Sequence, residues 1–413
     1  MTDSLLSGFR ALDLTNEKGF VCGKILAAFG VETIKVEKPG GDPARGIPPF
    51  LNNQQDLEKS LYWFAFNTDK RSITLNLEVS QGQDLFRKLV ERSDFVLESS
   101  APGYMDSLGL GYEALRRVNP RIILTSITPF GRKGPYAQYK GSELIASAMS
   151  GVLATNGDPD RAPVREGPDS IYFRSNAAAA LGTIIAHYHR QITGEGQQVD
   201  VSLQEVAASR TSSNLVVWEF DKRLIKRNAT IRTIGARATQ WLWQCKDGYV
   251  FWPYMGGQGG ARGNRALSLW IDDDGLENPL NKVKNWEEFD FVAISKEELE
   301  VHQEAIRKFF SNHTKKEIAE EGLRRGIHAA PISNPADVLQ NPQLKARDYW
   351  GDLEHAELGI KLTYPKYFFL SNETENFMRH RAPLIGEDND DIYAHELGLS
   401  GAEMAAFTKA GVI

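Results

Sequence analysis

The chain has 413 residues, of which 41% are hydrophobic, 25% charged and 10% aromatic, with a formal net charge of −6. This globular composition excludes disordered and fibrous proteins, and the acidic balance disfavours a nucleic-acid partner. Two cysteines, Cys22 and Cys245, exclude a disulfide framework and a cysteine-rich metal site. Neither a long apolar run nor a signal-peptide pattern is present, so we expect no membrane association and a cytoplasmic location.

Short β-like runs alternate with helical patterns in the first half of the chain. Strands are predicted over Phe9–Leu14, Glu32–Glu37, Ser72–Leu77, Phe95–Leu97, Ile122–Ile127 and Gln198–Leu203. Helices are predicted over Gly19–Phe29, Ser80–Arg92 and Asn176–His189. This alternation is typical of an α/β protein with a mostly parallel sheet and helices on its faces.

The second half of the chain has a different pattern. Residues 220–240 are basic and weakly patterned, which predicts a linker, and Trp241–Trp252 predicts an aromatic hairpin. Helical segments follow near 296–324, and the prolines and asparagines of 331–345 indicate a second linker. Ser400 with Glu403 three residues later predicts a capping box at the start of a final helix.

Standard motifs do not name an activity. The chain has no phosphate-binding P-loop pattern and no nucleophile elbow of the hydrolase type. The glycines of 256–260 do not have the dinucleotide-binding spacing, and no His, Cys or carboxylate cluster has metal-ligand spacing, so no metal is expected. From the residues alone, the chain is predicted to be an α/β enzyme acting on a small molecule.

A series of short segments gives a more specific signal. In chain order these are Asp13-Leu14-Thr15, Ile34–Arg45, Asn67–Ser72, Leu108–Tyr112, Phe130–Tyr136, Ala148–Gly151, Thr193–Gln197 and Pro383–Glu387. Together they resemble the family III CoA-transferases, and the likeness extends over essentially the whole chain.

The resemblance implies a fold and a reaction. The fold would be α/β, with a Rossmann-like large domain formed by residues 1–220 and by the C-terminal return 336–413. A small domain with linkers would occupy 221–335, and two chains would interlock in a dimer. The family moves CoA from an acyl-CoA to a free carboxylate, so a CoA thioester is a substrate and no permanently bound cofactor is implied. An aspartate attacks the thioester, which divides one difficult step into easier ones.

The position of that aspartate is altered here. We call the sequence position that matches the family's nucleophilic aspartate the nucleophile column. Counted without gaps from Thr193 or from Pro163, this column falls at or next to Tyr172. Asp169 stands three residues earlier, which in extended chain is roughly 10 Å away, whereas attack needs about 3 Å. Asp169 remains an alternative nucleophile if the loop rearranges, and its ordinary structural role would be to cap a helix.

Further departures lie around the expected site. Ser99 and Ser100 replace the asparagine and phenylalanine that usually follow the glutamate at the end of the fourth strand. Ser107 occupies the position where the family has a basic CoA contact. Where the family has a tyrosine followed by an acid, this chain keeps only the acid, Glu143, which is a weak catalytic candidate. Basic positions that match the family's CoA contacts are Lys38, Lys70, Arg71 and Lys140. Lysine and arginine suit the phosphates of CoA.

These departures gather at the active site while the segments that form the fold are kept. The chain therefore resembles a subunit that has lost its nucleophile and pairs with a homologous catalytic subunit, as an interlocked heterodimer or heterotetramer. It is similar to heteromeric family members that transfer CoA from succinyl-CoA to benzylsuccinate in anaerobic toluene degradation.

Three alternatives remain open at this level. The first is a self-sufficient homodimeric CoA-transferase that uses Asp169. The second is an acyl-CoA racemase or isomerase, although the histidine expected near Gly141 is missing. The third is a non-enzymatic CoA-binding or scaffold protein.

Overall fold

The computed structural model describes residues 4–167, 169–228, 230–234, 237–374 and 378–413. Contacts within the chain define two compact units. Unit 1 contains Met1–Leu153, Arg165–Leu224 and Gln343–Ile413, and unit 2 contains Ala154–Val164 and Ile225–Pro342. Unit 1 is thus discontinuous in sequence. Segment 154–164, which the sequence prediction placed in the large domain, belongs to unit 2.

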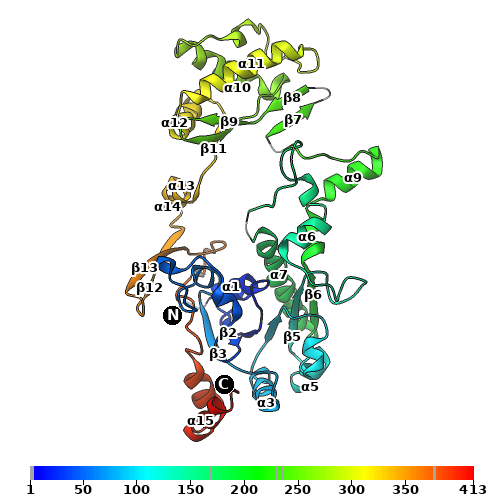
Figure 1. The fold of residues 1–413 in the computed structure, drawn as a ribbon, viewed down its shortest axis with the longest axis vertical. Helices are drawn as coiled ribbons and strands as arrows, with labels where there is room; N and C mark the ends of the chain where they lie inside the picture. Colours follow the sequence, from blue (N-terminus) through cyan, green and yellow to red (C-terminus); the bar gives the residue numbers. More distant parts are fainter. Residues whose placement is uncertain (1–3, 168, 229, 235–236, 375–377) are drawn as a thin grey trace. The chain divides into compact units, whose positions relative to one another are not determined.

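A six-stranded sheet forms the centre of unit 1 (Figure 1). Its strands are β1 (Arg10–Asp13), β2 (Glu32–Glu37), β3 (Lys70–Thr74), β4 (Phe95–Glu98), β5 (Ile123–Thr128) and β6 (Gln198–Ser202). They pair in the order β3-β2-β1-β4-β5-β6, and every pair is parallel. The predicted α/β class is therefore confirmed. The third strand begins at Lys70, two residues before the predicted start.

Helices cover both faces of this sheet, and successive residues of each strand point to opposite faces. Ala11 contributes to one hydrophobic cluster and Leu12 to the other, as successive strand residues must. On one face lie α1 (Phe20–Ala28) and α7 (Ser170–Thr193). On the other lie α3 (Ser80–Val90), α5 (Tyr112–Val118) and α15 (Gly401–Lys409). The result is a three-layer α/β/α arrangement, the common solution for a parallel sheet.

The remaining elements of unit 1 are short. The helices are α2 (Leu61–Phe66), α4 (Tyr104–Ser107), α6 (Glu143–Met149), α8 (Leu203–Ser209) and α9 (Ser212–Asp221). A hairpin of β12 (Trp350–His355) and β13 (Ile360–Pro365) precedes the C-terminal segment. Helix α7 begins six residues before its predicted start, because Ile171 and Tyr172 continue its buried face.

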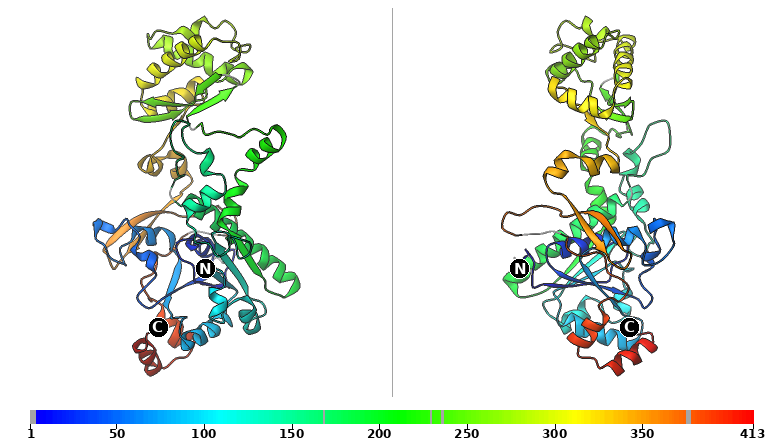
Figure 2. Two further views of the ribbon diagram at one scale, coloured as in Figure 1. Left: turned by 45° about the vertical axis from the view of Figure 1, so that its right-hand side comes forward. Right: turned by 90° about the vertical axis from the view of Figure 1, so that its left-hand side faces the viewer.

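The C-terminal segment is fixed against the third strand. The Tyr393 hydroxyl donates to the Thr74 carbonyl at 2.7 Å, and the Asn76 N–H donates to the Val412 carbonyl at 2.7 Å. The predicted capping box of Ser400 and Glu403 opens α15. Figure 2 shows the red C-terminal helices beside the blue and cyan helices of the N-terminal part. The end of the chain thereby completes one layer of unit 1.

Unit 2 has an aromatic core beneath a small antiparallel sheet. Strands β9 (Leu242–Cys245) and β10 (Gly248–Phe251) form the predicted hairpin, and β11 (Ala330–Pro331) pairs with β10. Helices α10 (Gly257–Asp273), α11 (Lys296–Ser311) and α12 (Lys315–Arg325) supply the rest of the core, so the glycines of 256–260 open a helix. The core includes Trp243, Trp252, Phe309 and Phe310.

Both predicted linkers contain regular structure. Strands β7 (Ile231–Ile234) and β8 (Arg237–Gln240) pair within the first. In the second, Pro335 and Pro342 begin the short helices α13 (Pro335–Gln340) and α14 (Pro342–Ala346). Proline is well suited to the first turn of a helix because no N–H is required there, so these prolines mark starts rather than loops. Among the described residues, no helix has the length and apolarity needed to span a bilayer.

Candidate functional site

The carboxyl ends of the first four strands open onto a crevice of 230 Å³. Its walls include Asn16 after β1, Lys38 after β2, Leu77 after β3 and Ser100 after β4. The strand order places β1 between β2 and β4, so the chain turns to opposite sides of the sheet here. Ligands of open parallel sheets bind at such a switch point, beyond the carboxyl ends of the strands. This crevice is the first candidate site.

The loops after β1 and β4, which contribute Asn16 and Ser100 to the crevice, are held by polar contacts. The Ser99 hydroxyl donates to the Asn16 side-chain oxygen at 2.8 Å and accepts the Asn16 N–H at 2.9 Å. The Ser100 N–H donates to the Glu98 carboxylate at 2.7 Å. Ser99, one of the two serines that depart from the family pattern, therefore links the loops after β1 and β4.

The crevice contains more carboxylates than cations, but two of the carboxylates are neutralised by buried partners. Glu37 pairs with Arg45 at 2.7 Å and Asp42 pairs with Lys35 at 3.2 Å. Burial alone would raise the pKa of Glu37, but the Arg45 guanidinium holds that pKa below its usual value. At the rim, Lys38 pairs with Glu78 at 2.8 Å, and both side chains are exposed. Lys38 is thus available to an anion that competes with Glu78.

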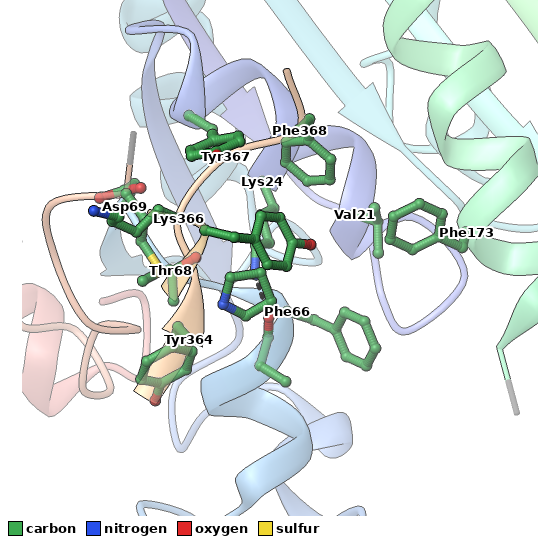
Figure 3. Close-up of a pocket in the computed structure, with 15 residues that line it drawn as sticks. Val21, Lys24, Phe66, Thr68, Asp69, Phe173, Tyr364, Lys366, Tyr367 and Phe368 are labelled. Carbon is green, nitrogen blue, oxygen red and sulfur yellow. Dashed lines mark hydrogen bonds between the residues drawn. The ribbon is translucent and has the colours of Figure 1, made fainter. Parts of the chain in front are cut away.

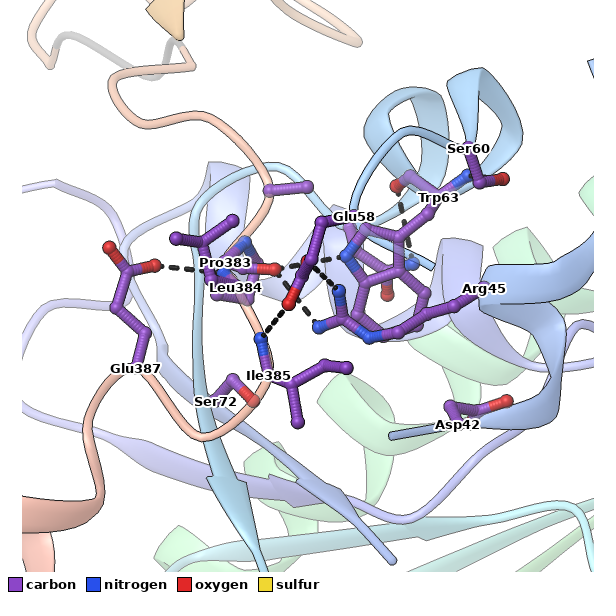
Figure 4. A network of polar contacts seen from close by, with 12 residues as sticks. Asp42, Arg45, Glu58, Ser60, Trp63, Ser72, Pro383, Leu384, Ile385 and Glu387 are labelled. Carbon is purple, nitrogen blue, oxygen red and sulfur yellow. Dashed lines mark hydrogen bonds and ion pairs between the residues drawn. The ribbon is translucent and has the colours of Figure 1, made fainter. Parts of the chain in front are cut away.

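Arg45 also attaches the C-terminal segment to this side of the sheet. Figure 4 shows its guanidinium between Glu58 and Pro383, next to the ring of Trp63. The guanidinium carbon lies 3.8 Å from the centre of that ring, and the indole N–H donates to the Pro383 carbonyl at 3.1 Å. The Ile385 N–H donates to Glu58 at 2.8 Å. The motif at Pro383–Glu387 therefore has a structural role here.

Lys70 lies inside the protein rather than in the crevice. Its ammonium donates to Asp13 at 2.7 Å, to the Phe20 carbonyl at 2.9 Å and to the Asn67 side chain at 2.8 Å. Both Lys70 and Asp13 are buried. A lysine has three N–H donors, so none is left for a phosphate. The geometry contradicts the predicted role of Lys70 as a CoA contact and assigns it to the fold.

Arg71 is used in a similar way. Its guanidinium contacts the carboxylates of Glu32, Asp388, Asp391 and Glu396. Three of these belong to the C-terminal segment, so Arg71 fixes that segment to β3. We therefore correct the expectation for Arg71 as well. Lys140 is exposed, and with Lys38 it remains a proposed CoA contact.

Tyr172, at or next to which the resemblance predicts the nucleophile column, lies near the start of α7. Tyr172 is 8% exposed, packs in the core, and its hydroxyl accepts the Glu143 N–H at 3.2 Å. Burial raises the pKa of Tyr172 to about 12. A neutral, packed phenol that already accepts a hydrogen bond is no substitute for a carboxylate nucleophile.

Glu143 is the acid that the resemblance singled out, and the structure places it against the same helix start. Its carboxylate accepts the Ile171 N–H at 2.7 Å and the Asp169 N–H at 3.2 Å, and it pairs with Arg165. The first N–H groups of a helix have no intrahelical partner and attract negative charge. Glu143 therefore satisfies the donors at the N-terminus of α7.

Asp169 occupies the N-cap position of α7 but makes no side-chain capping bond. Its backbone is left-handed, with φ of 59°, and its side chain is half-buried. Burial and the neighbouring Glu143 carboxylate raise the pKa of Asp169. The structure thus brings Asp169, Glu143 and Tyr172 together at one helix end, as three residues of distinct roles.

Sequence reasoning missed several residues of the crevice at the strand ends. Asn16, Glu78 and Tyr104 contribute to the crevice, and Tyr104 donates to Glu78 at 3.2 Å. A signal was present for Asn16, which is among the first polar residues after a buried strand. No such signal was present for Tyr104. Its helix follows β4 in the sequence, and only the folded structure brings its hydroxyl to Glu78 in the loop after β3. Within the described residues, no group of three or more His, Cys, Asp or Glu side chains is arranged to hold a metal ion.

The chain is similar to known proteins along its whole length, both in sequence and in fold. A curated relative from Thauera aromatica, named succinyl-CoA:(R)-benzylsuccinate CoA-transferase subunit BbsE, is 34% identical over 98% of each chain. A formyl-CoA:oxalate CoA-transferase from Streptomyces coelicolor is 29% identical over the full length of both. The crystal structure of a CAIB/BAIF family protein from Brucella suis matches with a TM-score of 0.79 and 25% identity, covering 95% of this chain and 99% of that one.

The sequence model of CoA-transferase family III matches residues 6–389, which include the crevice, the start of α7 and all of unit 2. The relatives span this chain from end to end and carry the names of CoA-transferases. The chain belongs to CoA-transferase family III, and its enzyme class is CoA-transferase.

Proposed function

We propose that this chain is the non-nucleophilic subunit of a heteromeric CoA-transferase that moves CoA from succinyl-CoA to benzylsuccinate or a closely similar acid. The observation on which this rests is the nucleophile column, where Tyr172 is buried and accepts the Glu143 N–H. A homologous catalytic subunit would supply the aspartate.

The hydrogen bonds at the start of α7 support the proposal that this chain does not itself catalyse attack on the thioester. Catalysis at a thioester requires donors directed at the oxyanion that forms in the transition state. Here the N–H groups of Asp169 and Ile171 already donate to the Glu143 carboxylate. An oxyanion at this position would meet occupied donors and a like charge, so the start of α7 favours a structural role.

The substrate proposal follows the relatives. The BbsE subunit, at 34% identity, is named for succinyl-CoA and benzylsuccinate, whereas the formyl-CoA:oxalate enzyme is 29% identical. Succinyl-CoA also appears in the name of a D-citramalate CoA-transferase from Chloroflexus aurantiacus that is 28% identical. Succinyl-CoA is therefore the donor we propose, and an aryl-substituted dicarboxylate is the acceptor.

An exposed face of α7 supports the proposed partner. Its exposed apolar side chains recur at intervals of three, four or eight residues and are Phe173, Leu181, Ile185, Tyr188 and Ile192. Helix α9 has exposed apolar side chains of its own, which are Leu215, Val216, Trp218 and Phe220. Apolar side chains gathered on one face mark an interaction surface. A second family chain is the occupant we propose, in keeping with the subunit designation of BbsE.

The decisive experiment compares the full chain alone with the chain co-expressed with a homologue that has aspartate at the nucleophile column. Each preparation receives succinyl-CoA, benzylsuccinate and hydroxylamine, and peptides are analysed by mass spectrometry. We expect transfer and hydroxamate formation only in the co-expressed complex, with the label on the homologue. Transfer by the chain alone, with the label at Asp169, would contradict the proposal.

A second candidate function is favoured by one observation. Asp169 makes no side-chain capping bond and its pKa is raised, so its carboxylate is not committed to the helix start. A homodimeric transferase that uses Asp169 is therefore the alternative, and the position of the hydroxamate distinguishes the two.

Asp169→Asn provides a separate prediction. In the co-expressed complex we expect the substitution to change the transferase kcat by less than about twofold, because removal of a nucleophile costs several orders of magnitude and Asp169 is not the nucleophile. The measurement is steady-state transfer from succinyl-CoA at saturating acid. The matched control is the same substitution at the partner's nucleophile column, which should abolish transfer.

Lys38→Gln tests the crevice. We expect the Kd for CoA to rise about three- to fivefold, since one exposed cation contributes modestly to binding an anion. The readout is calorimetric titration of the complex with CoA at two salt concentrations, because screening should shrink the effect at high salt. Lys409→Gln, at the exposed end of α15, is the control. Equal affinities for the two variants would remove Lys38 from the site.

A further inference from the structure

A second cavity, of 430 Å³, lies within unit 1 between α1, the end of α2 and the segment that follows β13. It shares no lining residue with the crevice at the strand ends. Its lining includes six aromatic residues, which are Phe66, Phe173, Tyr349, Tyr364, Tyr367 and Phe368. Small-molecule sites have this size and this lining, with a few polar groups that fix the ligand.

Lys24 is the unusual member of this lining. It is the single charged residue of α1, whose sequence is FVCGKILAA. Its ammonium donates to the Ala65 carbonyl at 2.6 Å, and within the described part of the chain it has no carboxylate within 4 Å. Burial lowers the pKa of Lys24 to about 8, so the ammonium is the main form at neutral pH. Two N–H donors and a positive charge therefore remain for a ligand.

Thr68 is a second polar residue of this lining. Its side chain is fully buried, and its hydroxyl makes no hydrogen bond among the residues that the structure describes. Leaving a buried hydroxyl unsatisfied costs free energy, and a ligand acceptor would remove that cost. Asp69, the next residue, is held by the Arg379 and His380 N–H groups, each 2.7 Å from one carboxylate oxygen.

The arrangement of these groups suggests the ligand. Figure 3 shows Lys24 between Thr68 and Asp69 on one side and the ring of Phe173 on the other. The Asp69 carboxylate already accepts the Arg379 and His380 N–H groups, and burial raises its pKa. An ammonium and a hydroxyl can both donate to a carboxylate, while the rings enclose an apolar body.

We propose that this cavity binds a small aromatic carboxylic acid, with Lys24 and Thr68 donating to the carboxylate and the ring lying against Phe66 and Phe173. The inference rests on the residues of this cavity and stands whether or not the proposed transferase function is correct. It adds a ligand site to a chain whose nucleophile column contains no nucleophile.

The test is calorimetric titration of the full chain with 3-phenylpropionate. Two matched probes separate the contributions, since propionate lacks the ring and 3-phenylpropan-1-ol lacks the charge. We expect saturable binding of one phenylpropionate per chain and at least about tenfold weaker binding of both matched probes. Equal affinity for the acid and the alcohol would overturn the proposal, as would the absence of saturable binding.

Two variants locate the site. Lys24→Met should weaken phenylpropionate binding by about tenfold or more, and Thr68→Val by about threefold or more, as expected for a charged and a neutral donor. Thermal unfolding monitored by circular dichroism checks that each variant is folded, and Thr68→Val alone serves if Lys24→Met does not fold. Lys409→Met, far from the cavity in sequence and exposed, should bind as the original chain does. Unchanged affinity in the folded variants would exclude this cavity.

Discussion

Lys70→Met should lower the free energy of unfolding at neutral pH by about 3–5 kcal/mol, the size typical of breaking a buried ion pair by removing one partner. The substitution leaves the Asp13 carboxylate buried without its closest cation, 2.7 Å away. Methionine fills much of the lysine volume, so the loss reports the charge rather than a cavity. Chemical denaturation of the full chain measures it.

The pH dependence of this loss has a defined sign. Burial would raise the pKa of Asp13, but the Lys70 and Lys35 ammonium groups hold that pKa below its usual value. A carboxyl whose folded pKa is lowered contributes stability that is fully present above its unfolded pKa, near 4, and is lost as the pH falls through the folded value. The difference between Lys70→Met and the original chain should therefore shrink below about pH 4.

Lys38→Met is the matched control for Lys70→Met. Both lysines were predicted to contact CoA, but Lys38 pairs with Glu78 at the exposed rim. Exposed ion pairs contribute little to stability, so the loss should be far smaller than for Lys70. The double variant Asp13→Asn with Lys70→Met should be more stable than Lys70→Met alone, because no buried charge is left unpaired. A Lys70→Met loss no greater than that of Lys38→Met would refute the structural assignment.

The sheet was predictable because its strands follow a simple rule. Parallel strands with helices on both faces are buried on both sides, so β4 begins with the apolar run Phe95–Leu97 and every residue of β5 is buried. The prediction began the third strand two residues too late, because Lys70 and Arg71 are polar and do not fit the pattern of a buried strand. Their place in the strand depends on partners that are distant in sequence. Asp13 and the C-terminal carboxylates supply those partners, and no local pattern reports them.

Spacing alone predicts the nucleophile column. Counting from Thr193 and Pro163 puts it at or next to Tyr172, and Tyr172 is a packed phenol in the structure. The resemblance singled out Glu143, but its position in the sequence did not show that its carboxylate accepts backbone N–H groups of α7 from a different helix. The same limit applies to the four basic positions. Residue type and position suggested one role for all of them, whereas burial separates Lys70 from Lys38.

Tyr172→Asp should not confer activity on the isolated chain, although it restores the residue type of the nucleophile column. We expect a loss of unfolding free energy of at least about 3 kcal/mol, because a buried ring is removed from the core beside α7. The new carboxylate would also lie near the carboxylate of Glu143, and like charges disfavour one another in a buried site.

Tyr172→Phe separates the ring from the hydroxyl. It keeps the packing and removes the acceptor of the Glu143 N–H, so we expect a smaller loss of about 1–2 kcal/mol. Denaturation and succinyl-CoA turnover of both variants are the measurements. Because Glu143 keeps the N–H groups of Asp169 and Ile171, an added carboxylate would still have no donors for the oxyanion. Transfer by the isolated Tyr172→Asp chain would show instead that Glu143 leaves these donors during the reaction.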